Sequence, residues 1–301
     1  MPLSMLSISC RRWWYVWLFS FGLSLSTHPA LASPSTEATA VFDWTIAETL
    51  LSLDPGTVVM GSIGYFHDWT DDEYADADII NVGVQTFPNM ELLNETSPHQ
   101  ILLAPRQAYM KGRLADIASI TLVNSFPYSQ RNEGDMWSVL KKFTLDVGNL
   151  VGRHDAAEQL VADAQSDLKD LKAELDSQLP LLVIQPVHEQ YARVYGANSM
   201  FQAVLEQLDL RNAWEGKTNQ WGYSLVSVSE LFAIQDARLV VVESPLPVGI
   251  ENRLEQSNIW RYLPVVQRGD FVVLPPSFWV MGSLPSARRF ADALVPALKE
   301  Q

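Results

Sequence analysis

Short apolar runs alternate with amphipathic segments along most of the chain after residue 40. The apolar runs have the length of buried strands and are predicted at 40–42, 58–61, 100–104, 121–123, 181–184, 239–243 and 271–274. Helical spacing of apolar residues predicts helices at 46–53, 88–95, 111–118, 199–208, 259–263 and 286–299. Strands that alternate with helices are typical of α/β folds with mainly parallel sheets.

The pattern changes in the middle of the chain. From Asp135 to about Ser177, apolar residues keep helical spacing, and Gly148 and Gly152 interrupt it. We therefore expect two helices or one kinked helix here. The predicted architecture is two α/β lobes with mainly parallel sheets, at 33–147 and 177–301, joined by one long rigid helix at 148–176.

The first 32 residues have the pattern of a signal peptide. Arg11 and Arg12 precede an apolar run from Trp13 to Leu25, and 30–32 read Ala-Leu-Ala, so cleavage is expected before Ser33. The run is shorter than the ~20 residues that span a membrane. The general secretory and the twin-arginine export routes both stay open. Cys10 precedes the apolar run, where a lipid-anchored cysteine would follow it.

Composition and net charge exclude several classes of protein and partner. Of 301 residues, 48% are hydrophobic and 19% charged, which is typical of a globular protein. With 21 basic and 35 acidic residues, the formal net charge is −14, and it becomes −16 once Arg11 and Arg12 are removed. An acidic chain without a basic face argues against a nucleic-acid partner. Cys10 is the single cysteine, so no disulfide framework is expected.

The chain lacks the common catalytic signatures. It contains no Gly-rich phosphate loop, no H-E-x-x-H and no nucleophile elbow. S-x-x-K occurs at 138–141 and 166–169, but both lie on polar stretches of predicted helices, where this spacing arises by chance. His154 and Glu158, four residues apart, predict a surface salt link rather than a metal site. These observations favour a binding protein over an enzyme.

Five segments resemble the periplasmic iron(III)-hydroxamate-binding proteins of siderophore ABC importers. They are 81–93, 194–202, 212–222, 226–231 and 278–282, and the most specific one reads Asn-Ala-Trp-Glu-Gly-Lys-Thr-Asn-Gln-Trp-Gly. The resemblance implies a ligand cleft between two lobes that close only slightly on a ferric siderophore. Such a complex is coordinatively saturated, so the resemblance implies neither protein ligands to iron nor a cofactor.

The resemblance also implies which residues contact the ligand. Its cleft tryptophans correspond to Trp44, Trp69, Trp221 and Trp279. Gln85 stands where the hydroxamate binders have an arginine, so a charge-assisted hydrogen bond is lost there. Met281 replaces a tyrosine, and the tyrosine expected near Ala104 is out of register. The candidates that could substitute for it are Arg106, Gln107 and Tyr109.

The family's partners imply a docking surface. One glutamate on each lobe is expected to pair with arginines of an inner-membrane ABC permease, which works with its ATPase, and the matching residues are Glu91 and Glu230. The alternative for Glu230 is a capping box with Ser227, and Glu91 in a first helical turn is favoured by the helix dipole alone. A periplasmic monomer is expected, with the outer-membrane receptor system as a further candidate partner.

Other ligands and another class of function stay open at this point. Because of Gln85, the ligand could be a hydroxamate held by different donors, or a carboxylate or mixed citrate–hydroxamate siderophore. Haem or a corrinoid is a variant on the same fold, and haem would need an axial histidine or tyrosine in the cleft. The alternative of another class is an exported Trp-rich enzyme or a carbohydrate-binding protein.

Overall fold

The first half of the chain forms a fully parallel five-stranded sheet in the order β3-β2-β1-β6-β7. The computed structural model describes residues 38–54, 56–125, 135–176, 178–245 and 259–299, so the predicted signal peptide lies outside the described residues. The strands of this sheet are β1 (Thr39–Val41), β2 (Val58–Met60), β3 (Ile79–Asn81), β6 (Gln100–Leu103) and β7 (Ser119–Leu122). A two-stranded hairpin, β4 (Gly83–Val84) and β5 (Phe87–Pro88), precedes β6.

The strand order reverses at β1. From β1 the chain continues to β2 and β3 on one side, whereas β6 and β7 are added on the other. Parallel α/β sheets bind ligands outside the carboxyl ends of their strands at such a reversal. Here the two segments at that position begin at Phe42 and Ala104. The helices of this half are α1 (Trp44–Leu51), α2 (Ile63–Thr70), α3 (Met90–Glu95), the 3-10 helix η1 (Pro105–Met110) and α4 (Lys111–Leu114).

The second half contains a mixed sheet in the order β10-β9-β8-β11-β12. β8, β11 and β12 are parallel, whereas β9 is antiparallel to both β8 and β10. The strands are β8 (Leu181–His188), β9 (Tyr191–Tyr195), β10 (Tyr223–Ser227), β11 (Arg238–Val242) and β12 (Phe271–Leu274). The helices are α7 (Met200–Gln207), α8 (Val228–Leu231), η3 (Trp260–Tyr262), α9 (Pro264–Gln267) and α10 (Leu284–Lys299). The prediction of a mainly parallel sheet thus holds fully in the first half and partly in the second.

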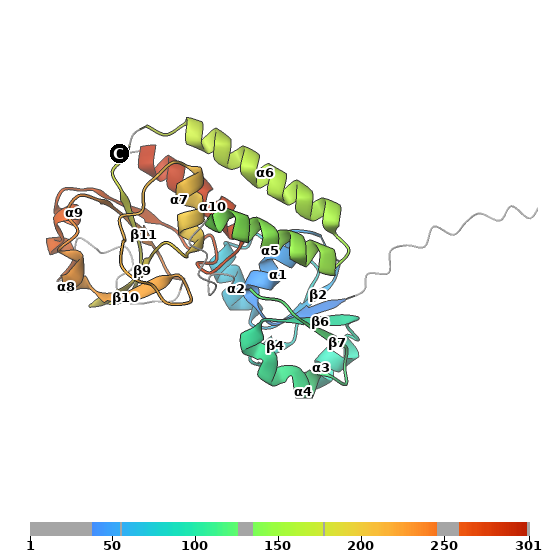
Figure 1. Ribbon diagram of the computed structural model, residues 1–301. Helices are drawn as coiled ribbons and strands as arrows, with labels where there is room; N and C mark the ends of the chain where they lie inside the picture. The colour runs from blue at the N-terminus through green and yellow to red at the C-terminus, as the bar shows by residue number, and fades with distance from the viewer. Residues whose placement is uncertain (1–37, 55, 126–134, 177, 246–258, 300–301) are drawn as a thin grey trace, which may run out of the picture. The chain divides into compact units, whose positions relative to one another are not determined.

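Of the two alternatives expected for residues 135–177, the structure has two helices and not one kinked helix. α5 (Met136–Leu150) and α6 (His154–Ala173) are separated by a turn in which Gly152 has a positive φ of 66°. α6 packs along α5 and α10 (Figure 1), and one buried apolar cluster includes Trp137 of α5, Leu168 of α6 and Phe290 of α10. A shared core of this kind opposes a wide hinge motion. The expected connecting segment 148–176 contains α6, and the lobe limits remain predictions.

Several elements escaped the sequence analysis, among them α2, β3, β9 and β10. α2 contains Gly64, which weakens its helical signal, and its cap residue Ser62 is left-handed and makes no side-chain cap. The sequences of β9 (Tyr-Ala-Arg-Val-Tyr) and β10 (Tyr-Ser-Leu-Val-Ser) contain apolar runs of at most two residues, shorter than those that predicted the other strands. Among the helices of the described residues, none has the length and apolarity needed to cross a membrane.

Candidate functional site

A cavity of about 230 Å³ lies between residues of the first and the second half of the chain. The first half contributes residues from the segments after β1 and β6 and from the β4–β5 turn, and the second contributes residues from the start of β10 and the loop after β12. The lining residues are Trp44, Gln85, Arg106, Trp221, Tyr223, Trp279 and Met281. Six of these seven are residues that the sequence analysis named.

Trp44 is the first residue of α1, directly after the strand-reversal point. Its indole Nε1 donates to the carbonyl oxygen of Gly61 at 3.4 Å, and its ring meets that of Trp279 edge-on, with centroids 5.1 Å apart and an interplanar angle of 77°. Thr45 donates its hydroxyl to the carbonyl oxygen of Met281 at 2.8 Å. These contacts join the tryptophans of the two halves into one wall.

Gln85 lies in the β4–β5 turn and is held against the segment after β2. Its backbone N–H donates to Ser62 Oγ at 3.1 Å. A Cβ at Gly61 would lie 2.7 Å from the backbone nitrogen of Gln85, so only glycine allows this approach. The turn therefore keeps the Gln85 amide at the cavity, where it can donate or accept but adds no charge.

Arg106, in the first turn of η1, is the charged residue among those that line the cavity. Its Nη2 donates to Oδ2 of Asp43 at 2.6 Å, and its guanidinium carbon lies 5.9 Å from the centroid of the Trp221 ring. Asp43 is fully buried, and its Oδ1 caps α1 by accepting from the N–H groups of Thr45 (3.0 Å) and Ile46 (3.2 Å). Arg106 thus contacts the first half through an ion pair and the second half through an aromatic ring.

Trp221 lies in the turn before β10, and Tyr223 is the first residue of that strand. Asn219 Oδ1 accepts from the backbone N–H of Trp221 at 2.8 Å, and Gly222 between the two aromatics has a φ of 80°. The Tyr223 ring packs 5.1 Å from the guanidinium carbon of Arg193. Sequence analysis missed Tyr223, the first residue of β10, because it did not predict this strand.

A buried polar contact between α1 and α10 fixes the cavity wall from behind. Glu48 of α1 is fully buried, pairs with Arg289 and accepts from Ser286 Oγ at 2.5 Å. Ser286 Oγ in turn accepts from the backbone N–H of Trp279 at 2.9 Å. Burial raises the pKa of Tyr74, beside this pair, to about 12, and the negative charge of Glu48 adds to the effect. One hydrogen-bonded chain therefore links the first half to a tryptophan that lines the cavity.

Three named candidates do not line the cavity. Trp69 lies inside α2, not in a strand-end loop, and it is 6% exposed with its ring edge-on to Trp279 at 5.3 Å. Gln107 is buried and bonds to backbone groups of Phe42 and Ala104, and Tyr109 is 63% exposed on η1. Trp69 and Gln107 thus contact residues beside the cavity, and ligand contacts by these three residues remain predictions.

The two docking candidates are exposed at helix starts. Glu91 lies in the first turn of α3, whose cap is Asn89. Glu230 of α8 accepts from the backbone N–H (3.1 Å) and the hydroxyl (2.7 Å) of Ser227, which confirms the predicted capping box. The Ser227 hydrogen bonds lower the pKa of Glu230, so this carboxylate stays charged at neutral pH.

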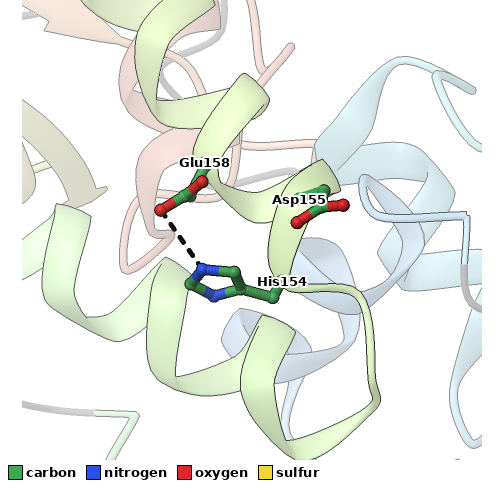
Figure 2. A group of neighbouring side chains, drawn as sticks. All are labelled: His154, Asp155 and Glu158. Atoms are coloured by element: carbon green, nitrogen blue, oxygen red, sulfur yellow. Dashed lines mark ion pairs between the residues drawn. The ribbon is translucent and has the colours of Figure 1, made fainter.

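Three side chains of types that can bind metal ions lie together on the surface at the start of α6. Figure 2 shows His154, Asp155 and Glu158, all exposed, with the His154–Glu158 ion pair drawn as a dashed line. His154 Nε2 lies 3.2 Å from Glu158 Oε1, and its Nδ1 lies 2.9 Å from Asn149 Oδ1. The predicted salt link is confirmed, and both ring nitrogens already have protein partners.

Residues 40–278 match a family described as periplasmic binding proteins. The chain belongs to this family. Membership confirms the expectation of a binding protein rather than an enzyme.

Relatives and solved structures agree with the family and the fold. The iron(3+)-hydroxamate-binding protein FhuD of Escherichia coli (strain K12) is 27% identical over 278 residues, which cover 91% of this chain and 90% of FhuD. A crystal structure of the siderophore-binding protein FhuD from Vibrio cholerae with bound Fe3+–Desferal superimposes with a TM-score of 0.78 at 24% identity, covering 88% of this chain and 98% of that one. The triscatecholate siderophore-binding protein FeuA from Bacillus subtilis, complexed with ferri-bacillibactin, gives 0.66 at 20% identity, with 89% and 94% covered. The predicted two-lobed α/β fold is therefore confirmed.

Proposed function

We propose that this protein binds a ferric siderophore, with a hydroxamate complex as the first candidate, and delivers it to an inner-membrane ABC permease. The observation that supports this most is the cavity itself, where Trp44, Trp221, Tyr223 and Trp279 surround one guanidinium and one amide. Flat aromatic surfaces suit the organic shell of a metal chelate, and the two polar groups can donate to its negatively charged oxygens.

The residue types at the cavity favour chelated over free iron. Among its described lining residues, Tyr223 offers the single side-chain oxygen of a kind that binds ferric iron, and carboxylate, imidazole and thiolate groups are absent. A bare ferric ion would need several such ligands. The relatives that bind iron–hydroxamate and Fe3+–Desferal complexes support the same ligand class.

The family supports both a periplasmic location of this protein and delivery of its ligand to a permease. Its description as periplasmic supports export, and the pattern of residues 1–32 supports a cleavable signal peptide. We assign Glu91 and Glu230 to permease docking, because both are exposed acids in first helical turns of different halves of the chain. The permease would act with its ATPase, downstream of an outer-membrane receptor.

Tyr223 makes haem a second candidate ligand. A phenol in a cavity can serve as an axial ligand to haem iron, as tyrosine does in some haem proteins. Haem therefore belongs in any ligand panel, as an outcome that would redirect the assignment while keeping the transport role.

Tryptophan fluorescence can test the function directly. We expect a ferric trihydroxamate to quench the emission of the three cavity tryptophans saturably, with micromolar or tighter affinity. The gallium(III) complex of the same siderophore serves as a redox-inert control that should compete for the site. Trp221→Phe should reduce the quenching, whereas Trp214→Phe, a tryptophan outside the cavity lining, should not. Absence of binding by every ferric siderophore tested would refute the proposal.

A further inference from the structure

Asp43 lies directly behind the cavity and divides its two oxygens between two tasks. Oδ1 caps α1, and Oδ2 accepts from Arg106 at 2.6 Å. Its side chain is fully buried, whereas that of Arg106 is 43% exposed. A buried carboxylate is stable only when it is paired and hydrogen-bonded. The ion pair with Asp43 therefore fixes the orientation of the Arg106 guanidinium and compensates its positive charge.

The other charged groups near the cavity are also arranged in a defined way. Glu48 and Arg289 neutralise each other behind Trp279. Arg193 donates to the neutral Gln185 at 2.8 Å and lies behind the Tyr223 ring. Arg106 is thus the cation at the cavity surface, and Asp43 is the acid that compensates it.

We propose that Asp43 is a positioning and selectivity residue for the ligand, which holds Arg106 over Trp221 and cancels its charge. The ion pair then offers strong N–H donors to the cavity while the pair as a whole carries no net charge. This inference rests on the proposed function, and it explains how an arginine on η1 can replace the one that Gln85 lacks. The ligand class that fits is a ferric complex whose chelating groups balance the iron charge.

Classes of ferric siderophore differ in the net charge of the complex, so a charged residue near the cavity can discriminate between them. Three hydroxamates, each with one negative charge, neutralise ferric iron, whereas three catecholates with two charges each leave a complex with three negative charges. A buried carboxylate behind the donor opposes the catecholate complex through a medium that screens poorly, and it affects a neutral complex little. Asp43 should therefore favour the trihydroxamate.

Three variants of the full protein test this proposal. Asp43→Asn keeps the capping oxygen and the side-chain volume but removes the charge. It should shift the ratio of dissociation constants toward a ferric triscatecholate, relative to a ferric trihydroxamate, on the order of tenfold. Arg106→Gln should shift the same ratio in the opposite direction. The double variant restores the balance of charge, and its ratio should return to within about threefold of the wild type.

The control and the outcomes separate this proposal from simpler accounts. Asp116→Asn removes one exposed carboxylate elsewhere and should leave the ratio unchanged, which excludes an effect of net charge alone. Thermal unfolding of each variant checks the α1 cap. If Asp43→Asn does not fold, the Arg106→Gln ratio decides the question. A wild type that binds ferric complexes while neither variant changes the ratio would overturn the role of Asp43. A wild type that binds no ferric complex would overturn the proposed function itself.

Discussion

Trp221 and Trp279 should respond differently to truncation, although both line the same cavity. Trp279 meets Trp44 at 5.1 Å and Trp69 at 5.3 Å, both edge-on at 77°. Trp221 stands at the other side, with Arg106 stacked on its ring. Replacing Trp279 by alanine therefore removes cavity surface and two edge-on ring contacts inside the protein, whereas Trp221→Ala removes cavity surface without breaking a contact to Trp44 or Trp69.

The magnitudes follow from these contacts. An edge-to-face aromatic pair contributes about 0.5–1.5 kcal/mol beyond its buried area, so Trp279→Ala should lose roughly 2 kcal/mol of folding free energy through its two pairs. In a chain of this size that corresponds to a fall in melting temperature of about 4–8 °C. Truncating a buried aromatic anchor at a binding site costs about 2 kcal/mol of binding energy, which is roughly thirtyfold in affinity.

Calorimetric titration and thermal unfolding on the same preparations separate the two effects. Both variants should bind a ferric trihydroxamate at least about tenfold more weakly than the wild type. Trp279→Ala should also melt several degrees lower, while Trp221→Ala should melt close to the wild type. Unchanged affinity in both variants would refute the aromatic wall, and equal melting temperatures would refute the supporting role of the Trp44 and Trp69 contacts.

Three further predictions concern Tyr74, Gln85 and the two docking glutamates. Because burial raises the pKa of Tyr74 to about 12, against about 10 in the unfolded chain, the folded state binds its proton more tightly, and stability should fall as the pH rises from 10 to 12. Urea unfolding should show about 2–3 kcal/mol less of this alkaline loss in Tyr74→Phe, and an identical loss would contradict the burial argument. Gln85→Arg should shift ligand preference toward anionic ferric complexes, and a flat selectivity profile would leave donation to Arg106. Glu91→Arg with Glu230→Arg should abolish siderophore-dependent growth on limiting iron while affinity in solution stays intact; normal uptake would show that both glutamates act only at their helix starts.

Much of the fold could be predicted because strands such as β1, β2 and β6 are wholly buried. Residues of one strand such as Ala40 and Val41 pack into different apolar clusters, on opposite faces of the sheet, so the strand appears as a continuous apolar run. β9 and β10 contain apolar runs of at most two residues, so they lacked that signal. The start of α2 is set by backbone contacts around Ser62, which has a left-handed conformation that no short pattern reveals.

The candidate site was predictable where a motif existed and not where distant segments meet. The resemblance to the hydroxamate-binding family identified Trp44, Trp221 and Trp279. Gln85 was identified because it replaces the arginine that this family has at the same position. Trp69 was also named from the resemblance, but the structure places it in α2, largely buried and outside the cavity lining, a packing that no sequence motif reveals. The pair of Glu48 and Arg289 could not be foreseen, because its partners are 241 positions apart and only folding brings them together.

Comparing the iron-loaded with the iron-free siderophore by calorimetric titration of the wild-type protein tests the central claim most directly. The fixed aromatic wall and the Arg106 donor should recognise the compact ferric complex, since the iron-free chain is flexible and would lose conformational freedom on binding. We predict one site that binds a ferric trihydroxamate with micromolar or tighter affinity and the iron-free form at least about tenfold more weakly. Equal affinity for both forms, or no binding of any ferric siderophore, would contradict the account.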